Sequence, residues 1–342
     1  MKIAFSFDIS KKIGSGHFYR CLALGKNLKR KNTEIHFLLK GKIYEKAEQE
    51  TKKNNFIIKY LKDNNINKIA KYLQANDIRG LVVDKPDLEI KFQKKIKSII
   101  KLLIVIQDIP KKNYCDILLN QNYLTYTKTK YKILSIKNTK LLLGPKYFIK
   151  NDNFKKQKVK KNKKNFLIHI FYGGSANSKN ILKVLKVILD LNLKNIKVEC
   201  FTGILNSNYK KLTKIFKNYK FIFFYKNKSP SFFLHHLVQS DLAFGSAGVS
   251  LFERLYFGVP SIVTSISQNQ INNAVLLKKK NKIIFLGNEK NVTGKKIKLA
   301  LVPLLNDKKK YDFLKRKTLS ASNEISKLSP ANQIYQSLRR VY

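Results

Sequence analysis

The sequence is poor in acidic residues and in arginine. Its 342 residues include 21 Asp and Glu against 70 Lys and Arg, which gives a formal net charge of +49. Only seven of the basic residues are Arg, and the other 63 are Lys, spread along the whole chain without gathering into an aromatic-lined groove. Proteins that read nucleic acid depend on the bidentate fork of Arg. We therefore expect solvated lysine faces and no nucleic-acid partner, although the positive field still attracts small anions.

Cysteines and long apolar runs are also scarce. The three cysteines, at positions 21, 115 and 200, include no C-x-x-C pair, so neither a disulfide framework nor a zinc site is indicated and buried free thiols are expected. The longest apolar stretches, such as 98–106 and 221–225, are too short to span a bilayer. Residues 1–8 have the pattern of a first strand and not of a cleavable leader. We expect a cytoplasmic protein without stable membrane association.

Strand-like and helix-like segments alternate through most of the chain, which is 44% hydrophobic. Apolar strands are expected at residues 3–7, 34–39, 80–84, 102–107 and 117–119, and again at 166–171, 196–201, 221–225, 241–244, 261–264 and 282–285. Helical spacing fills the segments between them. Such alternation predicts an α/β protein with two doubly wound Rossmann-like domains that face each other across a cleft.

A lysine-rich run gives the boundary between the two halves. Seven of the ten residues at 155–164 are Lys, and such a run repels itself and cannot enter a core. We expect an N-terminal domain at 1–150, a linker at 151–165, a C-terminal domain at 166–325 and a C-terminal helix at 326–342.

A glycine-rich turn follows the first expected strand. Asp8 ends that strand, and Gly14 and Gly16 precede His17 in the first turn of the next helix. Glycine lets the backbone approach a ligand closely, and a helix N-terminus favours anions. The third glycine of a dinucleotide fingerprint is missing, because Tyr19 stands there. The residues alone leave a structural and a catalytic role for His17 equally open.

The second half has three polar strand ends of the same kind. They are Gly173-Gly174-Ser175, Ser246-Ala247-Gly248 and Asn269-Gln270. Glu253 lies one to two turns into the helix after the second of them, where its carboxylate can accept hydrogen bonds from a ribose diol. Each turn alone is a common connection between a strand and a helix in α/β proteins, but the carboxyl ends of parallel strands lie at one edge of the sheet. The three together predict a site for an anion the size of a nucleoside diphosphate.

No metal and no cofactor are expected. H-E-x-x-H, P-loop and G-x-S-x-G motifs and clustered carboxylates are absent from the sequence. His36 and His169 lie inside strand patterns and are expected in the core or on a sheet face. The neighbours His235 and His236 cannot share one helix face, which argues against a metal site there.

Together these segments resemble the hydrolases of pseudaminic (nonulosonic) acid biosynthesis, which act on UDP-2,4-diacetamido-2,4,6-trideoxy-β-L-altropyranose, and their spore-coat polysaccharide relatives. The resemblance spans most of the chain, and the family is similar in turn to GT-B glycosyltransferases. Its landmarks are Gly14-Ser15-Gly16-His17-x-x-Arg20-Cys21-Leu22, residues 115–122 and 143–147, Gly173-Gly174-Ser175, Ser246-Ala247-Gly248-x-x-x-x-Glu253-Arg254-x-x-x-x-Gly258-x-Pro260, and Asn269-Gln270.

The resemblance implies a GT-B-like fold and a metal-independent hydrolysis, in which water attacks the anomeric carbon and UDP leaves with inversion. His17 matches the general base of the family and Asn269 an active-site asparagine. We expect the helix N-terminus to help keep the imidazole uncharged, as a base requires. Glu253 matches the carboxylate on the uridine ribose. The other residues expected at substrate and UDP are Gly14, Gly16, Arg20, Gly173, Gly174, Ser175, Ser246, Ala247, Gly248 and Gln270.

Three positions depart from the family pattern. Ser6 stands where an arginine is usual, Pro86 replaces a common tyrosine, and Ala176 stands where Asp usually follows Gly-Gly-Ser. These positions fall near the sugar side, so the accepted sugar can differ and the activity can be altered or lost. The alternative is a GT-B transferase that delivers its sugar to an acceptor other than water. We expect a UDP-sugar as the partner and a monomer as the working form.

Overall fold

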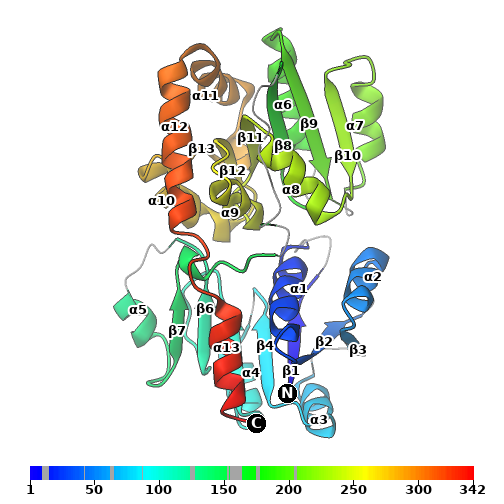
Figure 1. Ribbon diagram of the computed structural model, residues 1–342, viewed down its shortest axis with the longest axis vertical. Helices are drawn as coiled ribbons and strands as arrows, with labels where there is room; N and C mark the ends of the chain where they lie inside the picture. The colour runs from blue at the N-terminus through cyan, green and yellow to red at the C-terminus, as the bar shows by residue number, and fades with distance from the viewer. Residues whose placement is uncertain are drawn as a thin grey trace. The chain divides into compact units, whose positions relative to one another are not determined.

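In the computed structural model the chain forms two compact units, each built on one parallel β-sheet (Figure 1). Unit 1 contains Met1–Asn151 and Ser326–Tyr342, and unit 2 contains Asp152–Ile325. The structure describes residues 1–9, 15–41, 43–61, 65–86, 88–123, 128–151, 154, 164–174, 178–203 and 206–342. Gly14, Ser175, Ala176 and most of the expected 151–165 linker lie outside the described residues.

The sheet of unit 1 has seven strands in the order β3-β2-β1-β4-β5-β6-β7, and all neighbours are parallel. The strands are β1 (Lys2–Phe7), β2 (Glu34–Lys40), β3 (Ile57–Leu61), β4 (Gly80–Asp84), β5 (Leu102–Ile106), β6 (Ile117–Asn120) and β7 (Lys140–Leu143). The central strands β4, β5 and β6 are buried along their whole length, and they are apolar except at the last residues of β4 and β6, Asp84 and Asn120. This is the pattern required of parallel strands covered on both faces.

Helices cover both faces of this sheet. Side chains at alternate strand positions, such as Phe5 and Val82, pack under α1 (Gly16–Lys29), α2 (Glu45–Lys53) and α13 (Pro330–Arg339). The intervening side chains, such as Leu81 and Val83, pack under α3 (Ile66–Ala75), α4 (Ile90–Lys97) and α5 (Lys128–Ile133). Successive strand residues point to opposite faces, so one strand contributes to both layers.

The sheet of unit 2 has six parallel strands in the order β10-β9-β8-β11-β12-β13. They are β8 (Phe166–Phe171), β9 (Ile196–Thr202), β10 (Ile222–Lys226), β11 (Leu242–Ser246), β12 (Ser261–Ser265) and β13 (Ile284–Asn288). The helices are α6 (Lys179–Asp190), α7 (Tyr209–Ile215), α8 (Pro230–Val238), α9 (Val249–Tyr256), α10 (Ile271–Lys279), α11 (Gly294–Asn306) and α12 (Lys308–Ser320). Of these, α6, α7, α11 and α12 share one apolar core with the sheet.

The expectation of doubly wound α/β architecture is confirmed in both units. Two strands of unit 1, β3 and β7, were not predicted. Both lie at sheet edges, and half or more of the residues of each are not buried. Lys59 interrupts the apolar residues of β3, and the apolar run of β7 is only three residues long, so neither has the long apolar run of a central parallel strand. The C-terminal helix is shorter than 326–342, because Ser326 has a positive φ of 53° and Ser329 caps a helix that begins at Pro330.

The strand order reverses once in each sheet, and these points position the candidate sites. In unit 1 the reversal lies between β1 and β4, and in unit 2 between β8 and β11. Chains leaving the carboxyl ends of two such strands run in opposite directions and open a crevice, which is where open α/β sheets bind ligands.

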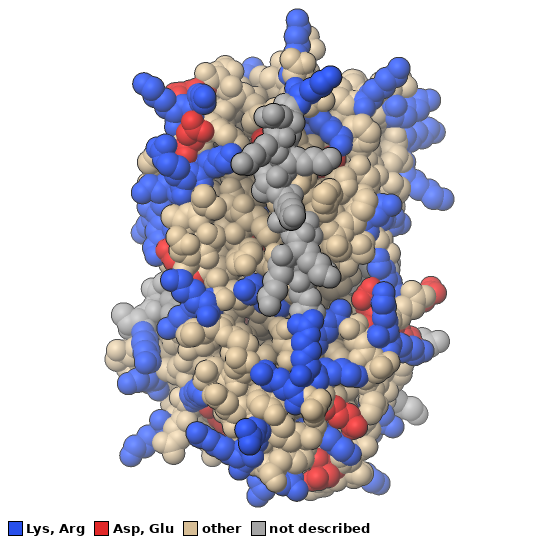
Figure 2. All heavy atoms as spheres, viewed as in Figure 1, with Lys and Arg blue, Asp and Glu red and all other residues tan. Residues whose placement is uncertain are grey.

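The surface and the thiols match the composition. Lys and Arg side chains are scattered over the visible face, with few Asp and Glu between them (Figure 2). Cys21, Cys115 and Cys200 are free and buried, as expected. Among the described residues, no helix combines the length and apolar character needed to cross a membrane.

Candidate functional site

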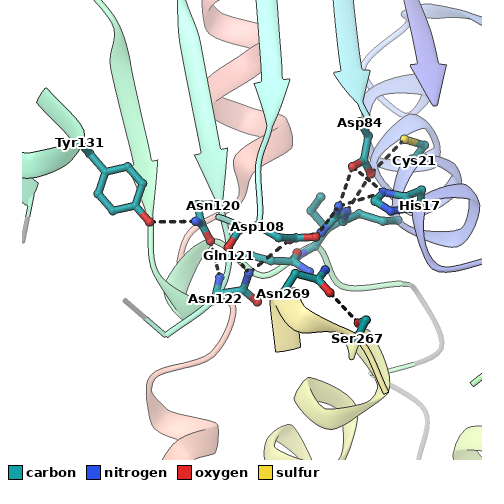
Figure 3. A network of polar contacts seen from close by, with 12 residues as sticks. His17, Cys21, Asp84, Asp108, Asn120, Gln121, Asn122, Tyr131, Ser267 and Asn269 are labelled. Carbon is teal, nitrogen blue, oxygen red and sulfur yellow. Dashed lines mark hydrogen bonds and ion pairs between the residues drawn. The ribbon is translucent and has the colours of Figure 1, made fainter. Parts of the chain in front are cut away.

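His17 is held by a carboxylate at the reversal point of unit 1 (Figure 3). It lies in the first turn of α1, and its Nδ1 atom is 2.8 Å from Oδ1 of Asp84, the last residue of β4. An ionised carboxylate only accepts hydrogen bonds, so the 2.8 Å contact assigns the proton to Nδ1 and leaves Nε2 as the nitrogen that can take one. Nη2 of Arg20 lies 3.2 Å from the same Nδ1, a longer contact than its own 2.6 Å hydrogen bond to Asp84. No described residue hydrogen-bonds Nε2, and 13% of the His17 side chain is exposed.

Arg20, one turn further along α1, joins two carboxylates. Its Nε and Nη2 atoms donate to the two oxygens of Asp84 at 2.8 and 2.6 Å, and Nη1 donates to Oδ1 of Asp108 at 2.8 Å. The side chains of Arg20 and Asp84 are 4% and 1% exposed. The Sγ atom of Cys21 also faces Asp84, at 3.7 Å. This bidentate, buried geometry fixes the carboxylate that orients His17.

Asp108 is the more exposed of the two carboxylates that Arg20 contacts. It follows β5, its side chain is 20% exposed, and the Nδ2 atom of Asn122, after β6, donates to its carboxylate at 3.2 Å. No sequence motif contains Asp84 and Asp108, and neither was among the expected site residues. A signal was present, because Asp84 is the last residue of β4 and Asp108 follows β5, so both belong to the same carboxyl edge as His17.

The pKa of His17 is raised above its ordinary value. Burial lowers this pKa, but the charge and hydrogen bond of Asp84 together outweigh burial and the opposing charge of Arg20. The helix N-terminus was expected to help keep His17 uncharged, but the net shift of its pKa is in the opposite direction, because a full carboxylate charge in direct contact exceeds the partial charge of a helix end. Burial raises the pKa of Asp84 and of Asp108, but Arg20 holds both below their usual range.

In unit 2, two glycine turns meet at the reversal point between β8 and β11. Gly173 follows β8 with φ of 103°, a conformation that favours glycine, and a Cβ there would lie 4.0 Å from Oγ of Ser246. A Cβ on Gly203, after β9, would lie only 2.2 Å from Cα of Gly174. Glycine at 203 is thus needed for the backbone of Gly174 to pass so close to it.

The turn Ser246-Ala247-Gly248 leads into α9, whose N-terminus has no side-chain cap. Ser246 ends β11, Ala247 is buried, and Gly248 is the N-cap residue of α9, which has no side-chain cap. First-turn N–H groups without a side-chain acceptor favour an anion, and the helix dipole adds to this. The side chain of Gln270 lies beside the turn, with Nε2 3.3 Å from the position of a Cβ on Gly248.

Asn269 and Glu253 present polar groups from neighbouring segments of unit 2. Asn269 lies in the 3-10 turn Gln268–Gln270, and Oγ of Ser267 donates to its Oδ1 at 2.6 Å, which leaves the Nδ2 donors for other partners (Figure 3). Glu253 lies on α9 and is partly exposed. Burial raises the pKa of its carboxyl to about 7, against the opposing charge of Arg254.

The structure therefore groups the expected site residues by unit. Gly16, His17 and Arg20 lie at the start of α1 in unit 1. The unit 2 residues are Gly173, Gly174, Ser246, Ala247, Gly248, Glu253, Asn269 and Gln270. Of the departures from the family pattern, Ser6 is buried in β1 and Pro86 is exposed after β4.

The remaining histidines have structural partners or packing. His36 and His169 are buried in β2 and β8, as expected, and His36 contacts Tyr72 and Glu34. His236 on α8 contacts Oε2 of Glu199 at 2.8 Å. The described residues contain no group of three or more His, Cys, Asp or Glu side chains that could hold a metal ion.

One curated relative resembles the chain in sequence, while no protein-family model matches it. The uncharacterised protein MJ1062 of Methanocaldococcus jannaschii is 30% identical over 283 residues, which cover 79% of this chain and 56% of that protein. The chain thus spans about half the length of this relative.

Several solved structures share the architecture over the whole chain. The Spinosyn Rhamnosyltransferase SpnG has a TM-score of 0.71 at 9% identity, covering 99% of this chain and 100% of its own. MurG of Acinetobacter baumannii has a TM-score of 0.65 at 12% identity, covering 99% of each chain. UDP-GlcNAc 2-epimerase of Neisseria meningitidis, solved with UDP-GlcNAc, has a TM-score of 0.66 at 12% identity, covering 99% and 100%. The fold of this chain is therefore GT-B-like, as expected.

Proposed function

We propose that the protein is a nucleotide-sugar hydrolase that releases UDP from a UDP-2,4-diacetamido-2,4,6-trideoxyhexose. The observation that carries the proposal is the contact between His17 and Asp84, which leaves Nε2 as the proton acceptor at the carboxyl edge of the sheet. In the proposed reaction a water molecule gives a proton to Nε2 of His17 while its oxygen bonds to the anomeric carbon. The bond from that carbon to the diphosphate oxygen breaks, its electron pair leaves with UDP, and the anomeric configuration inverts.

Asp84 has two functions in this scheme. Its hydrogen bond selects the tautomer with a free Nε2, and its charge stabilises the imidazolium that forms as water loses its proton. Arg20 keeps Asp84 ionised and fixed, so Arg20 acts as a positioning residue. Asp108 and Asn122 complete the support at the edge of the network.

The features of unit 2 support UDP as the leaving group. The N-terminus of α9 and the turns at Gly173-Gly174 and Ser246-Ala247-Gly248 offer backbone donors to a diphosphate. Glu253 would accept hydrogen bonds from the ribose hydroxyls, and Asn269 would donate from Nδ2 to the substrate. The UDP-GlcNAc complex of the 2-epimerase with the same fold agrees with a UDP-sugar as the ligand class.

A GT-B glycosyltransferase with a non-water acceptor is the second candidate. It is favoured by the structural likeness to MurG and to a rhamnosyltransferase. In that reaction His17 would deprotonate an acceptor hydroxyl, and UDP would form only when the acceptor is present.

The deciding experiment is UDP release from a panel of UDP-sugars without any acceptor, with and without a chelator. Hydrolysis predicts UDP formation in water alone, undiminished by chelator. In H₂¹⁸O the label would enter the sugar and not the UDP, and NMR would first detect the inverted anomer. No UDP release without an acceptor would exclude the hydrolase and favour the transferase.

Replacing His17 gives the residue-level test. His17→Ala is expected to fold normally and to lose UDP release by about 10²–10⁴-fold, the usual contribution of a general base. His235→Ala is the matched control, because His235 is exposed on α8 and lies outside both groups of site residues. A fully active His17→Ala protein would contradict the proposed role.

A further inference from the structure

Arg254 is a buried arginine under the turn that opens α9. Its side chain is 1% exposed. Nη2 donates to the carbonyl oxygen of Ser246 at 2.5 Å and Nη1 to Oγ of Ser250 at 3.4 Å. A Cβ on Gly245 would lie 2.4 Å from Nη1, so the guanidinium packs directly against the β11 backbone only because residue 245 is glycine.

No carboxylate among the described residues forms a hydrogen bond or an ion pair with this buried charge. Arg254 forms no ion pair with any acidic side chain that the structure describes, and its Nε has no hydrogen-bond partner there. The acidic groups near it are Glu253, whose pKa burial raises to about 7, and Tyr172, whose pKa burial raises far enough to keep the phenol neutral. Burial also lowers the pKa of nearby His169 well below its ordinary value, so that ring is neutral.

An uncompensated buried cation is costly. Moving a charge out of water costs several kcal/mol unless another charge or a set of hydrogen bonds replaces the solvent. Here the two acceptors are neutral oxygens, and the positive end of the α9 dipole lies at the same turn, which adds to the cost. Burial accordingly lowers the pKa of Arg254 to about 10, although Glu253 and Tyr172 oppose this.

From this geometry we infer that Arg254 is a positioning residue for anion recognition, whose buried charge is compensated by the diphosphate of a ligand bound at Ser246-Ala247-Gly248. By holding the Ser246 carbonyl inward, Arg254 fixes the turn that leads to the uncapped N–H groups at Gly248 and the start of α9. It acts through the peptide and its own field, without touching the ligand. The inference rests on the proposed nucleotide site. It names the charged diphosphate as the part of the ligand whose binding Arg254 supports.

The test compares ligands that differ only in the diphosphate. UDP and uridine are titrated by calorimetry into the full-length wild type and Arg254→Gln, which keeps a hydrogen-bond donor but loses the charge. We expect UDP affinity to fall about tenfold to a hundredfold in Arg254→Gln, because the buried charge that attracts the diphosphate is lost, while uridine affinity stays unchanged. Arg254→Lys, which keeps the charge, should fall between the two proteins.

Arg316→Gln is the matched control, because Arg316 is exposed on α12 of the same unit and its loss changes the net charge equally. UDP affinity should be unchanged in this control. If Arg254→Gln binds UDP like the wild type, or loses UDP and uridine equally, the inference is overturned. If wild type binds neither ligand, the proposed nucleotide site itself fails.

Selective ¹⁵N-arginine labelling tests the wild type directly, even if Arg254→Gln does not fold. Only seven arginines contribute signals, and the buried Nε–H of Arg254 is expected among the most slowly exchanging of them. Pyrophosphate and UDP should shift this resonance, and uridine should not. If the Nε–H resonance of Arg254 does not shift with pyrophosphate, at the concentration at which UDP saturates the protein, the inference is also overturned.

Discussion

The Nδ1 atom of His17 lies 2.8 Å from Oδ1 of Asp84, across 67 residues of sequence. Both groups lie at the carboxyl edge of the unit 1 sheet, one on the helix after β1 and the other at the end of β4. The contact gives the imidazole one defined tautomer and a raised pKa. A stronger base results, at the cost of being protonated over more of the neutral pH range.

The first prediction is a rise of activity with pH. A base works only when deprotonated, and the pKa of His17 lies above its ordinary value of 6.5. The turnover number for UDP release should therefore be low in acid and increase through an apparent pKa above 6.5. The measurement is kcat at saturating substrate between pH 5 and 9. A rate that is already maximal at pH 6 would contradict His17 as the base.

The second prediction concerns Asp84→Asn. Removing the carboxylate charge should lower the apparent pKa in the rate profile and reduce kcat at its plateau by about 10²-fold or more, because the imidazolium loses its stabilising charge. It should also destabilise the fold by about 3–5 kcal/mol, since buried Arg20 loses its bidentate partner. Chemical unfolding and the rate profile measure the two effects.

Asp108→Asn serves as the comparison for this change. It also removes a carboxylate partner of Arg20, but Asp108 is more exposed and forms no hydrogen bond with His17. Its rate profile should keep most of the wild-type pKa. Equal shifts in both variants would mean that the network as a whole, and not the direct contact, sets the pKa of His17.

The sequence predicts the fold well because buried parallel strands give continuous apolar runs. β1, β4 and β5 show this pattern and are found where they were expected. The edge strand β3 was missed, because Lys59 and Tyr60 are exposed there and interrupt it. Edge strands pack against one neighbour only, so their composition resembles that of a surface loop.

The site is predicted less completely than the fold. The place of His17 in the first turn of the helix after β1 is a local feature, and the sequence alone predicts it. The partners Asp84 and Asp108 come from strands that only the sheet order brings beside α1. The direction of the His17 pKa shift could not be predicted either, because it is the balance of burial, the carboxylates of Asp84 and Asp108, and Arg20, and the two carboxylates are distant from His17 in sequence.

The third prediction tests the close approach of two glycines in unit 2. In Gly203→Ala the new Cβ would lie 2.2 Å from Cα of Gly174, so the backbone must shift. We expect destabilisation of about 1–3 kcal/mol from overpacking and weaker UDP binding from displacement of the Gly173-Gly174 turn. Gly294→Ala is the control: it lies at the exposed start of α11, with only an ordinary contact to Val187. Unchanged UDP affinity in Gly203→Ala would separate this turn from the ligand.

The fourth prediction concerns Glu253, whose pKa is raised by burial to about 7. An acid with a folded pKa above its ordinary value of 4.5 contributes stability below that ordinary value, and this is lost as pH rises through about 7. Glu253→Gln should therefore raise the melting temperature at pH 8 and leave it nearly unchanged at pH 4. Glu253→Gln also separates stability from ligand binding.

Ribose recognition requires the ionised form of Glu253, because only the carboxylate accepts two hydroxyl hydrogen bonds. The affinity of the wild type for UDP should therefore increase as pH rises through about 7, while Glu253→Gln should bind UDP weakly at every pH. Calorimetry with UDP and with its 2′,3′-dideoxy analogue separates the effects, since the analogue offers no diol. If the analogue showed the same pH dependence as UDP, Glu253 would not be the ribose ligand.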